Sequence, residues 1–154
     1  TNTDLYEWEL WLSKFLTNPF SWDRLFFFAK RMYSKSADEK KAKEFVESLL
    51  SNKNELKLSS YAGAPTDHTI IPFGKGICGQ VAVSNQNFVV PDVAAQDNYI
   101  ACSITVKAEI VVPLFINGEN IGQIDIDSNT PDPFTEADER FLEWVNEQVA
   151  QILD

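Results

Sequence analysis

Apolar side chains recur with a helical period in the first third of this chain and follow strand patterns afterwards. Over residues 4–17 they recur every three or four positions, which predicts an amphipathic helix. Residues 36–50 repeat that pattern behind Ser36 and Glu39, a pair typical of a helix N-terminus. Between these segments, residues 22–33 fit either a buried strand or one helical face, and we favour the strand.

The remaining sequence predicts several strands followed by one helix. Five segments are rich in β-branched residues, and we expect strands at 55–62, 69–73, 87–93, 108–116 and 120–127. The pair Asn117-Gly118 joins the last two and predicts a tight hairpin. Thr135 and Asp138 open a C-terminal helix. Because hairpins pair strands antiparallel, this order predicts an α+β domain with terminal helices packed on a sheet.

Composition narrows the class of protein and its partners. The 154 residues fit one domain, and 44% of them are hydrophobic, which is enough for a core without disulfides or metals. The formal net charge of -10 argues against nucleic acid and anionic membranes as partners. No apolar run approaches the roughly 20 residues of a membrane helix. With only two cysteines, we expect free thiols in a reducing, cytoplasmic compartment.

Two features resemble known sites without their usual context. Residues 74–79 match G-x-G-x-x-G, but the helix after them is shorter than the roughly dozen residues that a dinucleotide-binding crossover needs. We therefore interpret the segment as a tight glycine turn that leads into a short helix. His68 is the sole histidine, so neither a Ser-His-Asp triad nor a recognisable metal site is expected. We predict no metal and no cofactor.

The cysteines and three carboxylates could carry chemistry, and each set also has a plainer explanation. Cys78 begins the short helix, whose dipole would lower the pKa of a thiol, and Cys102 lies in a loop. The alternative is that both are small buried residues. Asp125 and Asp127 share one strand face near Glu109, where crowding raises a carboxyl pKa and supplies a general acid or a cation site. The alternative is a solvated strand face.

Five short stretches follow one another between residues 71 and 128: IPFGKGICG at 71–79, VVPDV at 89–93, IAC at 100–102, EIVVP at 109–113 and IGQIDIDS at 121–128. This ordered set is similar to the free methionine-(R)-sulfoxide reductase branch of the GAF family. The helix that follows matches as well. Any one fragment would be weak, but the ordered set is specific because it contains both cysteines and all three carboxylates.

The resemblance implies a fold and a domain organisation. It implies a GAF (profilin-like) fold, with a central antiparallel sheet of about six strands, terminal helices on one face and a ligand pocket on the other. Residues 1–154 would form a single GAF domain, with the helix at 36–50 inserted between the first two strands. Because GAF modules often pair through their terminal helices, a homodimer fits this organisation, and the aromatic side chains expected on residues 4–17 are compatible with it.

The resemblance also implies a reaction. In the reductases, the cysteine that matches Cys102 attacks the sulfoxide sulfur, and methionine leaves a sulfenic acid behind. The cysteine that matches Cys78 resolves it as a disulfide, which thioredoxin reduces. The carboxylates that match Glu109, Asp125 and Asp127 hold the substrate amine and help to protonate the sulfoxide oxygen.

The family encloses the methyl-sulfoxide end of the substrate with a Trp and a Tyr from an early strand, and Trp22 and Phe26 have the matching spacing. Phe26 lacks the hydroxyl, Ser103 replaces an acidic residue, and Asp67 stands near the place of a third cysteine. Two hypotheses follow. One is a reductase of free methionine sulfoxide, and the other is a non-catalytic GAF module that binds another small ligand or senses a redox signal.

Overall fold

The computed structural model describes residues 6–13, 54–63, 68–99 and 105–153. Within them, six strands form one sheet with two helices and a short 3-10 turn. The strands are β1 (Tyr6–Leu12), β2 (Glu55–Ala62), β3 (Ile70–Pro72), β4 (Phe88–Val90), β5 (Ala108–Ile116) and β6 (Glu119–Ser128). The helices are α3 (Gly76–Ser84) and α4 (Glu136–Leu153), and the 3-10 turn is η2 (Val93–Ala95). None of these helices is long and apolar enough to cross a membrane.

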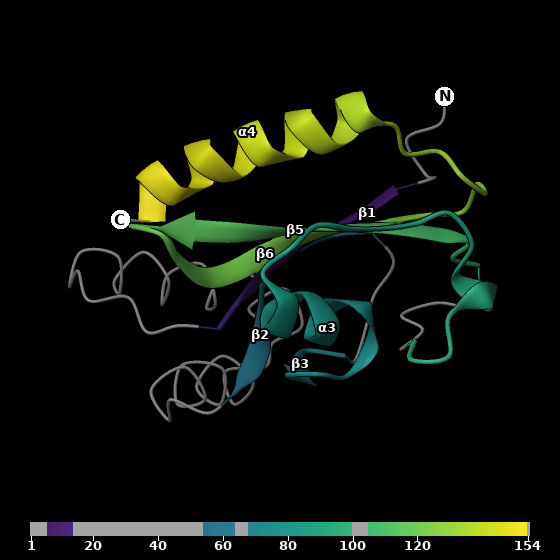
Figure 1. Cartoon of the computed structure of the whole chain (residues 1–154), viewed down its shortest axis with the longest axis horizontal. Helices are drawn as coiled ribbons and strands as arrows, with labels where there is room; N and C mark the ends of the chain where they lie inside the picture. The colour runs from purple at the N-terminus through teal and green to yellow at the C-terminus, as the bar shows by residue number, and fades with distance from the viewer. Residues whose placement is uncertain (1–5, 14–53, 64–67, 100–104, 154) are drawn as a thin grey trace.

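The sheet is antiparallel throughout, with strand order β3-β2-β1-β6-β5-β4. Helix α4 runs along one face, and α3 lies against the other (Figure 1). The predicted α+β fold with six antiparallel strands is therefore confirmed. The predicted strand at 22–33 and the predicted helix at 36–50 lie outside the described residues.

The helix predicted for residues 4–17 is wrong, because residues 6–12 form strand β1 in the middle of the sheet. β1 pairs with both β2 and β6, which are remote from it in sequence. Trp11 and Leu12, on opposite faces of the strand, are both fully buried. A strand covered on both faces can carry apolar residues at any spacing, so the helical period of this segment was misleading.

The hairpin and the glycine turn were predicted well because their signals are local. Asn117 and Gly118 have φ values of 51° and 78°, as a type I′ turn between β5 and β6 requires. A side chain at Gly79 would place its Cβ 2.7 Å from the Pro72 carbonyl oxygen. The glycine at this position therefore lets α3 approach the preceding turn closely, and the segment is a tight turn followed by a short helix, as expected.

The two faces of the sheet are covered differently. On the α4 face, a buried apolar cluster contains Ile110, Val112, Ile124, Ile126 and Leu142. On the α3 face, a larger cluster includes Trp11 of β1 and Ile77, Cys78 and Val81 of α3. The carboxylates of the predicted site share this second face.

Helix α4 begins at the predicted cap and leaves aromatic side chains in solvent. The Thr135 N–H donates to Asp138 Oδ2 at 2.7 Å, and the Asp138 N–H donates to Thr135 Oγ1 at 3.3 Å. Phe141 and Trp144 are 53% and 54% exposed and stack with ring centroids 6.1 Å apart. The expectation that aromatic residues of the segment 4–17 support a dimer is not met at Trp11, which is buried in the sheet.

Candidate functional site

Four carboxylates from three adjacent strands meet on the α3 face of the sheet. Asp125 and Asp127 lie on β6, with Glu9 of β1 opposite Asp125 and Glu109 of β5 opposite Asp127. Each of the four is at most 5% exposed. The alternative of a solvated strand face for the predicted acids is therefore wrong.

Cys78 joins the acids from the opposite side, from the first turn of α3. Its thiol donates to Asp125 Oδ2 at 3.1 Å and lies 3.8 Å from Glu109 Oε1. Cys78 is 4% exposed and is a free thiol. The close approach of α3 at Gly79 helps to bring this thiol onto the sheet. The structure thus brings together four of the predicted site residues: Cys78, Glu109, Asp125 and Asp127.

Burial dominates the electrostatics of the acids. It raises the pKa of Glu109 to about 7, against a lowering by a hydrogen bond with Asp125 and a further rise from Glu9. Burial also raises the pKa of Asp125 well above its usual range, and the neighbouring charge of Asp127 adds to this rise. The predicted crowding of carboxylates with raised pKa is confirmed for these two groups. At neutral pH, Glu109 exchanges readily between its protonated and ionised forms.

The prediction for the Cys78 thiol has the wrong sign. Burial raises its pKa well above the usual range, and Glu109 and Glu9 raise it further, while the hydrogen bond to Asp125 lowers it. Desolvation and several nearby carboxylates therefore outweigh the helix dipole. Cys78 is a protonated thiol at neutral pH.

Glu9 and Trp11 are part of this site, and the sequence pattern did not identify them. The Trp11 Nε1–H donates to Glu9 Oε2 at 3.3 Å, and both residues are buried. One oxygen from each of Glu9, Asp125 and Asp127 lies within 4.8 Å of the other two. Cys78, Glu109 and Asp125 form a second such group, so either could hold a cation. Recognising the segment as a strand would have placed Glu9 and Trp11 on one face.

The residues that precede Cys102 along the chain lie close to the glycine turn and the start of α3. The Gly76 N–H donates to Asn98 Oδ1 at 2.9 Å, and Asn98 Nδ2 donates to the Gly74 carbonyl at 2.9 Å. Tyr99 and, after the segment, Val106 both pack in the cluster that contains Cys78. Cys102 itself, together with Trp22 and Phe26, lies outside the described residues.

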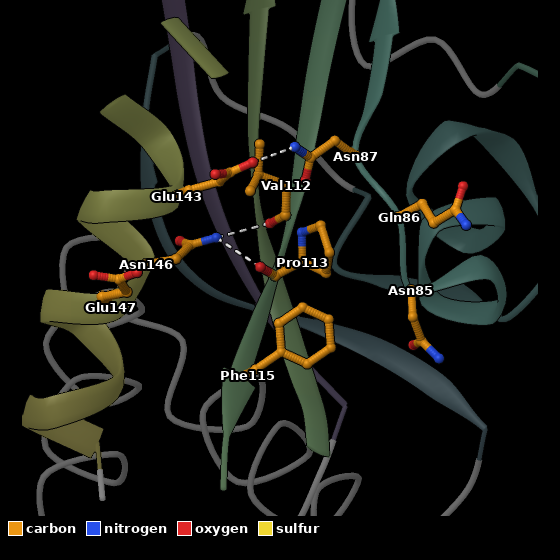
Figure 2. A pocket seen from close by; sticks show the side chains of 9 residues that line it. All are labelled: Asn85, Gln86, Asn87, Val112, Pro113, Phe115, Glu143, Asn146 and Glu147. Carbon is orange, nitrogen blue, oxygen red and sulfur yellow. Dashed lines mark hydrogen bonds between the residues drawn. The ribbon is translucent and has the colours of Figure 1, made fainter. Parts of the chain in front are cut away.

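A separate cavity of about 590 Å³ lies between α4, β5 and the segment 85–87 (Figure 2). Asn146 Nδ2 donates to the carbonyl oxygens of Val112 and Pro113 at 2.9 and 3.0 Å. Asn87 Nδ2 donates to Glu143 Oε1 at 2.9 Å, which ties the far wall of the cavity to α4. These hydrogen bonds, donated by side-chain amides, anchor helix α4 on the face of the sheet away from the Cys78 thiol.

Comparisons with known proteins agree with this architecture. A family model described as GAF domain matches residues 37–154. GAF domain-containing protein A of Dictyostelium discoideum is 39% identical over 106 residues, which are 69% of this chain and 64% of that protein. The free methionine-R-sulfoxide reductase of Saccharomyces cerevisiae is 40% identical over 94 residues, 60% of this chain and 52% of the enzyme. The chain therefore spans between half and two thirds of these relatives.

Two solved structures resemble the chain over different extents. The free methionine-R-sulfoxide reductase of Neisseria meningitidis, in complex with its substrate, has a TM-score of 0.63 and 38% identity over 67% of this chain and 61% of that one. A type II free methionine-R-sulfoxide reductase from Thermoplasma acidophilum has a TM-score of 0.70 over 99% of this chain and 81% of that one. At 24% identity, this second likeness supports the fold alone.

Proposed function

Since the chain belongs to the GAF domain family, and parts of it resemble free methionine-R-sulfoxide reductases, we propose that it reduces free L-methionine-(R)-sulfoxide to methionine. The observation that carries this proposal is the buried contact between a thiol and two acids. Cys78 Sγ lies 3.1 Å from Asp125 Oδ2, beside Glu109 with a pKa of about 7. Reduction of a sulfoxide by thiols needs both a second thiol and a proton donor in one place.

In the proposed reaction, the two cysteines supply the electrons. The Cys102 thiolate attacks the sulfoxide sulfur while the oxygen is protonated, which forms a bond between the Cys102 sulfur and the methionine sulfur. The hydroxyl group then transfers to the Cys102 sulfur as the methionine sulfur loses its bonds to oxygen and to Cys102. Methionine leaves with its sulfur reduced, and Cys102 is oxidised to a sulfenic acid. The Cys78 thiol then attacks the Cys102 sulfur, so that a disulfide forms and water departs. A thioredoxin-type dithiol reduces the disulfide and returns both thiols.

Glu109 is the proposed proton donor. A sulfoxide oxygen is a poor leaving group until it is protonated, and an acid is most effective when its pKa is near the working pH. The pKa of Glu109 meets that condition because the side chain is buried. Asp125 and Asp127 then remain as acceptors for the ammonium group of the free amino acid.

The protonated state of Cys78 suits a resolving thiol. A neutral thiol does not compete with Cys102 for the sulfoxide, and Asp125, as its hydrogen-bond acceptor, can take its proton when the disulfide forms. Cys102 follows Tyr99 by three residues, a length that spans at most about 10 Å. Because Tyr99 and Val106 both pack in the cluster of Cys78, this short reach favours a meeting of the two sulfurs.

The proposal also assigns the parts of the chain outside the described residues. Residues 1–154 form a single GAF domain, with the helix at 36–50 as an insertion between the first two strands. Trp22 and Phe26 enclose the methyl-sulfoxide end of the substrate. The sulfoxide is the oxidant and the dithiol the reductant, so the electron balance closes with these reactants.

Turnover of the two cysteine variants tests this function. Wild type with thioredoxin and its recycling system should convert free L-methionine-(R)-sulfoxide continuously. Cys78→Ser, with the same recycling system, should release about one methionine per chain and then turn over far more slowly than wild type, because its sulfenic acid has no resolving thiol to form the disulfide that thioredoxin reduces. Cys102→Ser should release none. A folded wild type that binds methionine sulfoxide but turns over none would support the non-catalytic binding module instead.

A further inference from the structure

Glu9 is a buried carboxylate that the proposed reaction leaves without a role. It is 1% exposed, lies on the central strand β1, and is opposite Asp125 in the strand register. One of its oxygens is oriented by the indole N–H of Trp11 at 3.3 Å. Burying a carboxylate opposes folding unless its partners compensate, so an acid held at the centre of the sheet invites a functional explanation.

The arrangement of Glu9, Asp125 and Asp127 has the dimensions of an ammonium site. One oxygen from each lies within 4.8 Å of the other two. A primary ammonium offers three N–H donors in a tetrahedral arrangement. Acceptors about 2.8 Å from its nitrogen would lie about 4.6 Å from one another, which is within that limit.

Asp125 provides a second sign that a ligand belongs here. Its Oδ2 accepts from Cys78, whereas its buried Oδ1 has no hydrogen-bond partner among the residues that the structure describes. A buried acceptor without a donor is uncommon in native proteins and points to a group that arrives from outside. A bound ammonium would supply the donor.

We propose that Glu9 is the third acceptor for the primary ammonium of the amino-acid substrate, together with Asp125 and Asp127. The four acids then divide into two tasks. Glu9 and Asp127 bind the amine, Glu109 serves the sulfoxide, and Asp125 contacts both the amine and Cys78. This inference takes the identity of the ligand from the proposed function, but the binding that it predicts does not depend on turnover.

The assignment predicts selectivity for ligands that keep all three N–H donors. An N-methyl group replaces one donor, so one carboxylate of the three is left without its bond. A charged hydrogen bond of this kind accounts for roughly a tenfold change in affinity or more. In Glu9→Gln, the N-methyl group of the methylated ligand can lie beside the substituted side chain, whose hydrogen bond to the ammonium is already weaker, so less is lost by methylation. The variant should therefore bind L-methionine less tightly and also distinguish less well between L-methionine and N-methyl-L-methionine.

Calorimetric titration with these two unreactive amino acids tests the assignment. For wild type we expect N-methyl-L-methionine to bind about tenfold more weakly than L-methionine, and for Glu9→Gln the ratio should fall to about threefold or less. Glu119→Gln, at the exposed hairpin, removes the same charge outside the site and should keep the wild-type ratio. Equal weakening of both ligands in Glu9→Gln would mean a structural role, and unchanged affinities would mean none, so either result overturns the proposal.

A measurement on wild type covers the case in which Glu9→Gln does not fold. The indole N–H resonance of Trp11, assigned with Trp11→Phe, should shift when L-methionine is added and stay in place when 4-(methylthio)butanoic acid, which lacks the amine, is added. No shift with L-methionine contradicts the proposal. A chain that binds L-methionine through Glu9 but shows no turnover would refute the reductase and leave this inference standing, whereas normal turnover with a Glu9-independent affinity would refute this inference alone.

Discussion

The two faces of strand β6 are almost equally buried and chemically opposite. Ile124 and Ile126 point toward α4 and are 7% and 3% exposed, whereas Asp125 and Asp127 point toward α3 and are 1% and 3% exposed. Burial of the isoleucines stabilises the fold, while burial of the aspartates opposes it. One strand therefore anchors the domain on one side and holds poised acids on the other. The acids can be kept in this unfavourable state because the α4 face supplies compensating stability.

The largest expected difference between the effects of substitutions on the two faces of the sheet comes from neutralising the proposed proton donor. Glu109→Gln should lower kcat by about 10³-fold, because general-acid catalysis typically contributes between 10² and 10⁴. KM should change little, since Glu109 is not among the proposed amine acceptors. In the pH profile of kcat/KM, the limb at about pH 7, where Glu109 titrates, should disappear in the variant. A variant with wild-type kcat and an unaltered profile would remove Glu109 from the chemistry.

The acids on this face also show how far the sequence leads. Asp125 and Asp127 could be placed together because alternation along a strand is a local rule. The bounds of β5 and the turn at Asn117 were predictable for the same reason. The contact between Cys78 and Asp125 depends on how α3 docks, which follows from a close approach at Gly79 that no periodicity encodes.

The central strand shows where the sequence fails. β1 acquires its conformation from β2 and β6, which lie far along the chain, and its burial on both faces hides the alternation. The helical interpretation of this segment therefore also hid Glu9. The sign of the Cys78 pKa was missed for a related reason, because the helix position is visible in the sequence and the desolvation is not.

Shortening a buried side chain on the α4 face should have the opposite consequence to Glu109→Gln, because it should lower stability and leave catalysis unchanged. Leu142 is 2% exposed in the cluster under α4, and Leu142→Ala should reduce the free energy of unfolding by about 3 kcal/mol. At a temperature where the variant stays folded, its kcat and pH profile should match wild type. Urea denaturation and turnover on the same sample measure both quantities. A loss of activity without a loss of stability would show that the two faces are coupled more closely than their packing indicates.

The most gradual expected effect is the pH dependence of stability that the acid face imposes. Glu109 has a pKa of about 7 in the folded protein and an ordinary value of 4.5 when unfolded, so the folded state binds more protons between these limits. The contribution of Glu109 to stability should therefore fall as the pH rises from about 4.5 to about 7, by about 3 kcal/mol in total. Urea midpoints measured across this range should show the decline in wild type and in Leu142→Ala alike, because both retain the acids. Glu109→Gln should be more stable than wild type at pH 8 and show a flatter curve. If stability fell with pH as steeply in Glu109→Gln as in wild type, Glu109 would not be the source of the decline. The two faces of the sheet would then differ in the side chains that they bury but not in the way that this acid affects stability.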